Sequence, residues 1–234
     1  MQHFAYLLIN FLTILFPLLL SFDKKVHFYK RWRHLLPGLL ITGTVFLVWD
    51  CYFTLKNVWS FNSQYIIGWN IMGLPIEEIL FFITVPFSCV FIYECLQAYF
   101  PANSWKKVST PVNVLLMLLS VYMLIQYHDR IYTVVTFSLL MLIVLYVQLS
   151  NWQFMGRFYQ AFAVSLLPFY LVNGILTSVP IVLYNNAENI GFRIWTIPFE
   201  DHFYSMALLL MNIVLFEYYK KRDLRSSNER LAGV

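Results

Sequence analysis

Charged residues are scarce in this chain of 234 residues: Asp, Glu, Lys and Arg make up 12% of it, whereas hydrophobic residues make up 60%. The mean hydropathy is +0.64. In soluble globular domains about a quarter of the residues are charged. The composition therefore excludes an ordinary soluble enzyme and predicts an integral membrane protein.

Cysteine is rare as well, with Cys51, Cys89 and Cys95 in or at the ends of apolar stretches. They form no CxxC pair and show no Cys/His spacing typical of zinc sites. The chain also lacks the GxGxxG fingerprint of dinucleotide-binding domains. We therefore expect no metal site, no bound flavin and no bound nicotinamide, and we interpret the cysteines as small packing residues.

Long apolar stretches account for nearly all of the sequence, and little remains for an extramembrane domain. A helix needs about 20 residues to cross a hydrocarbon core of about 30 Å. The first stretch has no basic segment before it and no small-residue cleavage site, so we expect a permanent span, not a secretory signal. The predicted spans are residues 3–21, 35–55, 75–97, 111–127, 131–149, 157–180 and 198–219.

The 16 basic residues are distributed unevenly over the predicted loops, which alternate between the two sides of the bilayer. Only Lys56, Arg130 and Arg193 fall on one side, and the other 13 fall on the opposite side. The positive-inside rule makes the basic side cytoplasmic. We expect an outside N-terminus and a cytoplasmic C-terminus, in the cytoplasmic membrane of a bacterium. The net charge of +4 needs no nucleic-acid partner to explain it.

An internal repeat is visible, because residues 50–94 align without a gap on residues 173–217 at a constant offset of 123. The matching polar and proline positions are Asp50 with Asn173, Thr54 with Thr177, Asn62 with Asn185, Gly68 with Gly191, Pro75 with Pro198, Glu77 with Glu200, Glu78 with Asp201 and Glu94 with Glu217.

The repeat predicts an all-α, seven-span membrane protein built from two parallel three-helix repeats. Residues 1–99 hold spans 1–3, residues 131–220 hold spans 5–7, and residues 100–130 form a connector with span 4. Residues 221–234 are expected to be a basic cytoplasmic tail. Because one extra span separates the repeats, both point the same way, related by an axis along the bilayer normal. We expect a central site between them.

Acidic residues gather where the third helix of each repeat begins, after Pro75 and Pro198. Proline fits the first turn of a helix, and carboxylates there interact well with the helix dipole. The simplest reading is therefore helix-start acids at a wet interface. Two features argue against it: the acids are paired in both copies, and Asp50 and Asn173 lie roughly 9 Å below the outer ends of the preceding spans. Ionisable residues within a membrane are functional candidates. The predicted catalytic residues are Glu77, Glu78, Glu200 and Asp201.

Lys and Arg are missing from the spans that hold these acids. Arg157, at the inner end of the sixth span, is the one Lys or Arg in any predicted span. A desolvated carboxyl beside a second carboxyl resists ionisation, so we expect at least one to keep its proton at neutral pH, as acid catalysis requires. Adjacent helical residues point about 100° apart. One member of each pair is therefore expected to act and the other to support it.

Aromatic residues make up 19% of the chain, and most are expected to face lipid or anchor the interfaces. Phe81 and Tyr204 follow Glu77 and Glu200 at i+4 and so share their helix faces. We predict that these two rings contact substrate and stabilise a carbocation, with Asp50 and Asn173 as further substrate contacts.

Glu94 and Glu217 also match in the repeat but lie 17 residues beyond Glu77 and Glu200, roughly 25 Å away. We expect them to form structural ion pairs with Lys106, Lys107 or Lys220 near the cytoplasmic face.

The strings GLPIEEILFF and TIPFEDHFY, preceded by VWDCYFT and VNGILT, closely resemble the signature of the integral-membrane lycopene cyclases. In that family the enzyme is either two small subunits or one fused chain, and this chain resembles the fused form over both repeats. The resemblance implies cyclisation of the ends of lycopene and other carotenes to β-rings, giving γ-carotene and then β-carotene without net redox change. It implies Glu77, Glu78, Glu200 and Asp201 as the functional carboxyls. Association with other carotenoid enzymes or with a second copy is a further expectation, as is contact with the lipid bilayer.

Two other classes of protein would also place acids in membrane helices. A polyprenyl-diphosphate transferase would need Mg²⁺ between carboxylates and diphosphate, with bases to hold the phosphates, and only Arg193 is nearby. A proton-coupled transporter would use the acids as relays, but it commonly has broken helices and inverted repeats. Both remain alternatives to the cyclase.

Overall fold

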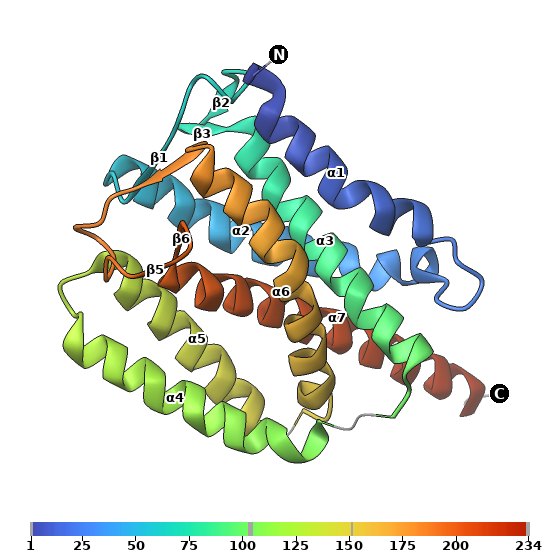
Figure 1. Ribbon diagram of the computed structural model, residues 1–234. Helices are drawn as coiled ribbons and strands as arrows, with labels where there is room; N and C mark the ends of the chain where they lie inside the picture. The colour runs from blue at the N-terminus through green and yellow to red at the C-terminus, as the bar shows by residue number, and fades with distance from the viewer. Residues whose placement is uncertain (1, 103–104, 151, 233–234) are drawn as a thin grey trace.

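The computed structural model describes residues 2–102, 105–150 and 152–232, and helices dominate it (Figure 1). Within these residues, seven helices are long and apolar enough to cross a membrane. They are α1 (Ala5–Leu20), α2 (Trp32–Leu55), α3 (Ile76–Tyr99), α4 (Ser109–Gln126), α5 (Ile131–Leu149), α6 (Met155–Ser178) and α7 (Phe199–Ala232). Three 3₁₀ turns, η1 (Gln2–Phe4), η2 (Phe28–Arg31) and η3 (Lys106–Val108), precede α1, α2 and α4.

The helix limits lie close to the predicted spans except at the end of α7. That helix continues well past residue 219, through much of the predicted tail, to Ala232; residues 233–234 of the tail lie outside the described residues. The extension is rich in Lys and Arg, which are good helix formers even though they are not apolar. Hydropathy locates where a helix leaves the hydrocarbon core, not where it ends.

Each of the two long loops at one end of the bundle, called here the loop end, contains three short strands. The loop between α2 and α3 holds β1 (Trp59–Phe61), β2 (Asn70–Ile71) and β3 (Leu74–Pro75). The loop between α6 and α7 holds β4 (Val182–Tyr184), β5 (Arg193–Ile194) and β6 (Ile197–Pro198). Pairs β2–β3 and β5–β6 are two-residue hairpins that lead into α3 and α7. The prolines therefore stand just before the helices, not within their first turns.

Strands β1 and β4 pair antiparallel and join the two loops. Trp59 pairs with Tyr184, Ser60 with Leu183, and Phe61 with Val182. Ser60 and Leu183 are 123 positions apart, so the register is symmetric about these two residues. The axis that relates the two halves in the membrane stays a prediction.

Helices from the two halves of the chain pack across one another. α2 packs on α7, and α6 packs on α3; α1 also packs on α3, and α5 on α7. α1 lies on one flank, α4 and α5 lie on the opposite flank, and the other four helices lie between them (Figure 1). The starts of α3 and α7, with their acidic first turns, are thus enclosed by helices and loops of both halves.

Candidate active site

A cavity of about 70 Å³, called here the chamber, lies beneath the joined loops. Helices α3 and α7 contribute one carboxyl each, Glu78 and Asp201. The other lining residues are mostly aromatic: Tyr6, Trp59, Phe61, Phe81, Phe82, Tyr132, Phe169, Tyr184 and Tyr204, with Val85, Asn173, Leu176, Val182, Ser205 and Leu208. One acid from each half of the chain therefore borders the same small, aromatic space.

Tyrosine hydroxyls hold both carboxyls of the chamber. Tyr6, on α1, donates a hydrogen bond to Oε2 of Glu78. Asp201 accepts one from Tyr132, on α5, at 2.6 Å, and one from Tyr184, on β4, at 2.8 Å. These bonds reach the two different oxygens of Asp201. The partners thus differ in number between the halves: one hydroxyl for Glu78 and two for Asp201.

The Tyr184 hydroxyl acts as a donor because it keeps its proton. Burial, and then the neighbouring Asp201 carboxylate, raise the pKa of Tyr184 well above its ordinary value of 10.0. A neutral phenol has one O–H to donate, and here Asp201 receives it. Strand β4 thus positions the Asp201 side chain from the loop above it.

Glu77 and Glu200 point elsewhere, toward the backbone of the loops. Oε1 of Glu77 accepts the N–H of Ile67 at 2.7 Å, and Oε1 of Glu200 accepts the N–H of Ile190 at 2.8 Å. The Thr133 hydroxyl also donates to Glu200, at 2.6 Å. Both glutamates are buried and neither borders the chamber. They tie the loops to the starts of α3 and α7.

Asp50 and Asn173, which are equivalent in the repeat, take different positions. Asp50 is fully buried and accepts a hydrogen bond from the Trp59 indole N–H at 2.6 Å. It positions one wall of the chamber but does not border it. Asn173 borders the chamber directly. The predicted aromatic pair, Phe81 and Tyr204, borders it from opposite halves.

Cations are held away from these acids. Within the described part of the chain, none of the carboxyls of Asp50, Glu77, Glu78, Glu200 and Asp201 forms a salt bridge.

Arg193, seven residues before Glu200, donates to the carbonyl of Thr196 and to the Asn186 side chain, both at 2.8 Å. It is thus engaged within its own loop. At the opposite end of the bundle Lys220 bridges Glu94 at 3.2 Å and Glu217 at 3.4 Å, which confirms the expected ion pairs with Lys220 as the partner.

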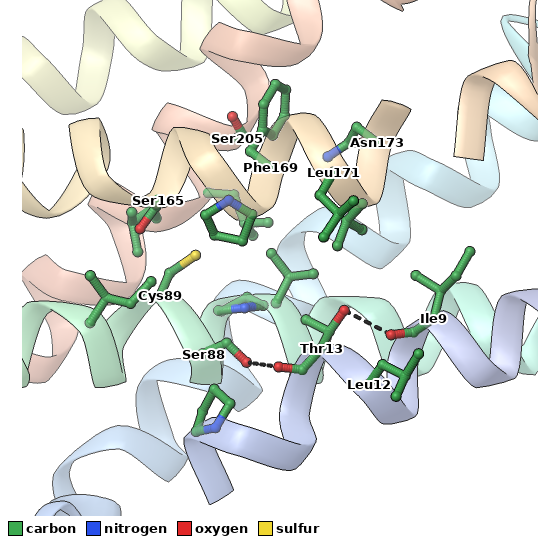
Figure 2. A pocket seen from close by; sticks show the side chains of 18 of the residues that line it. Ile9, Leu12, Thr13, Ser88, Cys89, Ser165, Phe169, Leu171, Asn173 and Ser205 are labelled. Carbon is green, nitrogen blue, oxygen red and sulfur yellow. Dashed lines mark hydrogen bonds between the residues drawn. The ribbon is translucent and has the colours of Figure 1, made fainter. Parts of the chain in front are cut away.

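A second, larger cavity of about 330 Å³ adjoins the chamber between α1, α3, α6 and α7. Its walls are apolar side chains with a few small polar ones, among them Thr13, Ser88 and Ser165 (Figure 2). Asn173, Phe169 and Ser205 border both cavities. Val85 of α3 and Leu208 of α7 also border both, so the two spaces meet between α3, the second half of α6 and the first turns of α7.

The tyrosines that hold the carboxyls were not among the residues predicted from sequence. Tyr6 and Tyr132 play matching roles but stand 126 positions apart, outside the segment that aligns at 123. Tyr184 falls on Phe61 in the repeat, an aromatic match that carries little weight in so aromatic a chain. A gapped comparison of the first spans would have found the first pair. The hydrogen bonds themselves depend on tertiary packing.

Comparison with known proteins identifies the family of the chain. A family model described as lycopene cyclase matches residues 3–96 and 129–219. Bifunctional lycopene cyclase/phytoene synthases are similar over shorter stretches. That of Aspergillus oryzae is 24% identical over 96 residues, 38% of this chain and 16% of that protein. That of Phaeosphaeria nodorum is 31% identical over 88 residues, 37% of this chain and 14% of that protein.

The matches thus span well under a fifth of these relatives' own length. No solved structure matches the chain. The family model, in contrast, covers both acidic helix starts, α1, α2, α5 and α6. Since it accounts for most of the residues, including all the carboxyls and tyrosines of the chamber, the chain belongs to the lycopene cyclase family.

Proposed function

We propose that this protein converts the acyclic ends of lycopene to β-rings by proton transfer, giving γ-carotene and then β-carotene. One observation carries the proposal: Glu78 and Asp201, from different halves of the chain, border one aromatic chamber. Cyclisation adds a proton to the end of the polyene and removes another from it. Two carboxyls on one small space can do both, with no redox cofactor.

The size of the chamber suits a folded end group. A cavity of about 70 Å³ has room for roughly five water molecules at about 10–15 Å³ of accessible space each, so it can take one chain end but not a whole carotene. Confinement there favours the folded conformation of the chain end, in which its two terminal double bonds lie close together. Holding reacting groups in such a geometry supplies part of the rate enhancement.

Glu78 is the proposed acid. It accepts a single hydroxyl and borders the chamber. Its proton is delivered to C2 of the terminal C1=C2 double bond, which leaves a tertiary cation at C1. The π electrons of the C5=C6 bond then form the C1–C6 bond and move the cation to C5.

Asp201 is the proposed base. A carboxylate is an acceptor only, and Asp201 accepts a hydroxyl on each of its oxygens. It takes the proton from C6, the C–H electrons form the C5=C6 bond of the β-ring, and the reaction ends as an isomerisation. Acid and base have then exchanged roles, and no proton is consumed overall.

Aromatic faces supply the charge stabilisation that the cation needs. Tyr204 lies with its ring centroid 5.9 Å from that of Tyr132 and 6.2 Å from that of Trp59. All three border the chamber together with Phe81. A cation beside such faces is stabilised by about 0.5–2 kcal/mol per ring. The same rings exclude water, which would otherwise add to the carbocation.

Glu77 and Glu200 are proposed to support the reaction by fixing the loops that cover the chamber. Asp50 is proposed to support it by orienting Trp59. The membrane orientation is part of the proposal too: the 13 bases assigned to one side place the loop end and N-terminus outside and the C-terminus in the cytoplasm.

Expression in a lycopene-accumulating bacterium, followed by chromatography of the pigments, tests the function. We expect γ-carotene and β-carotene to replace lycopene. The Glu78→Gln protein, present in the membrane at the same level, is expected to leave lycopene unchanged. If lycopene persists with the natural chain in the membrane, the proposal is wrong. Accumulation of γ-carotene alone would restrict it to cyclisation of one end.

A further inference from the structure

The large cavity beside the chamber reaches the surface of the bundle that faces lipid. α1 and α6 both pack on α3, and the cavity lies between them. On α1 its lining residues Leu12 and Phe16 are 51% and 64% exposed, and on α6 Leu171 is 65% exposed. Side chains of α1 and α3 face those of α6 across this space (Figure 2). One end of the cavity is therefore open at the membrane face, and the other meets the chamber.

Two of the hydroxyls in the cavity wall, those of Ser88 and Thr13, are bonded to backbone carbonyls, whereas the buried Ser165 hydroxyl has no hydrogen-bond partner among the described residues. The Ser88 hydroxyl donates to the carbonyls of Thr13 at 2.9 Å and Thr84 at 2.7 Å. The Thr13 hydroxyl donates to the carbonyl of Ile9 at 2.8 Å. Most of the remaining lining is Ile, Leu, Val, Phe and Pro. The wall thus offers a long apolar contact and few free hydrogen-bonding groups, which fits a hydrocarbon and not a polar chain.

We propose that this cavity is the site for the polyene arm of the carotene, which runs from the chamber between α1 and α6 into the bilayer. The inference rests on the proposed function, because it takes the chamber as the place where the end group reacts. Its new content is the route and the rule of recognition. Substrate enters sideways from lipid, end first, and the arm leaves the protein between Leu12 and Leu171.

A specificity follows from this geometry. The protein encloses the end group and the nearest part of the arm, while the far end of the molecule lies in lipid. The enzyme therefore recognises an acyclic end on an apolar arm and not the length or the far end of the carotene. γ-Carotene, whose other end is already a ring, is expected to be cyclised with a KM close to that of lycopene.

The first test narrows the opening with tryptophan from either side. Leu12→Trp and Leu171→Trp place a larger side chain at lining positions on two different helices, α1 and α6. The matched controls are Leu8→Trp and Leu167→Trp, one helical turn away on the same helices. Leu8 and Leu167 are 54% and 75% exposed and do not border the cavity. Because all four positions face outward, none of these changes adds bulk to the packed core.

We expect the two lining variants to raise KM for lycopene roughly tenfold or more, with kcat within about threefold of the parent, because arm binding is lost but the chemistry is not. The controls are expected to match the parent in both constants. A second measurement needs no turnover. The amount of lycopene that co-purifies with Glu78→Gln protein should decrease when Leu12→Trp or Leu171→Trp is combined with it in the same chain. It should not change when Leu8→Trp or Leu167→Trp is combined with it.

The outcomes separate the two proposals. If the parent cyclises lycopene and the lining variants behave like their controls in KM and in retention, the arm site is wrong and the cyclase proposal stands. If the parent forms no rings but retains lycopene in a way that only the lining variants reduce, the cavity binds the polyene and the cyclase proposal fails. A parent that neither cyclises nor retains lycopene overturns both.

Discussion

The two halves of the chain share the same backbone hydrogen bonds around their acidic pairs but differ in the side chains that contact the second acid of each pair. In each half a loop N–H binds the first acid of the pair, Ile67 to Glu77 and Ile190 to Glu200, at positions 123 apart. The second acid of each pair borders the chamber. Backbone hydrogen bonds on either side of β1 and β4 repeat at the same offset: Asn62 N–H donates to the carbonyl of Ile181, and Asn185 N–H to that of Val58.

The difference lies in what surrounds the second acid. Tyr184 donates to Asp201, whereas the matching position in the first half is Phe61, which has no hydroxyl. Asp50 orients Trp59, whereas the matching Asn173 borders the chamber itself. A symmetric frame therefore brings two carboxyls together, and a few unmatched side chains give them different partners. An acid and a base need that distinction.

The largest effects are expected from removing either chamber carboxyl. Glu78→Gln and Asp201→Asn keep the side-chain volume and one acceptor oxygen, but an amide cannot exchange a proton. General acid–base catalysis contributes about 10²–10⁴-fold to a rate, and we expect losses of that order in each. The initial rate of ring formation in isolated membranes measures this. If only one of the two changes matters, the halves do not cooperate in a single site.

The next effect should come from exchanging the unmatched pair of aromatic residues. Tyr184→Phe removes one hydrogen bond to the proposed base. A hydrogen bond to a charged group is worth about 1.5–3 kcal/mol, so the rate should fall roughly tenfold to a hundredfold. Phe61→Tyr adds a hydroxyl to the matching wall, and we expect a smaller loss as the halves become more alike. Equal rates in Tyr184→Phe and the parent would remove the proposed reason for assigning Asp201 as the base.

Changes in the loop-binding glutamates should affect stability more than chemistry. Glu77→Gln and Glu200→Gln keep the oxygen that accepts the loop N–H but replace a carboxyl by a neutral amide. Charge-assisted hydrogen bonds are about twice as strong as neutral ones, so we expect the unfolding free energy to fall by about 1–2 kcal/mol. Thermal unfolding in detergent measures this loss, and the cyclisation rate should remain within about tenfold of the parent.

The same variants decide between the two members of each acidic pair. A rate as low as that of Glu78→Gln in folded Glu77→Gln protein would transfer the catalytic role to Glu77. The same comparison holds for Glu200→Gln against Asp201→Asn.

The smallest effect is expected at Asp50, whose counterpart in the other half of the chain is already an amide, Asn173. Asp50→Asn retains an oxygen that can accept the Trp59 N–H, so the wall of the chamber should hold. We expect a loss of only a few-fold in rate, since the hydrogen bond from Trp59 is kept. Trp59→Phe is the matched comparison, because it removes the donor; the two changes together should cost little more than the larger one alone.

The helices could be predicted from sequence because a membrane demands apolar runs of fixed length. The predicted span 131–149 matches α5 at both ends, and the other limits differ by three residues or fewer apart from the end of α7. The strands of the loops were not predicted. They are two or three residues long, and the pairing of β1 with β4 joins segments more than 120 residues apart, which no local pattern reveals.

Part of the site could be predicted as well. The offset of 123 brought the four acids together with Asp50, Asn173, Phe81 and Tyr204, and the structure places most of them around one chamber. Spacing alone could not say which acid of each pair faces inward. That choice depends on the loops, which present N–H groups to Glu77 and Glu200, and on tyrosines of α1, α5 and β4 that reach Glu78 and Asp201.

By itself the sequence determined the class of protein, the positions of its spans and the presence of paired acids without cations. These features follow from local composition and from the repeat. Only the tertiary structure decided that one acid of each pair shares a chamber, that tyrosines hold them, and that a larger apolar cavity adjoins the chamber. Those relations join residues distant in sequence, and packing between helices sets them.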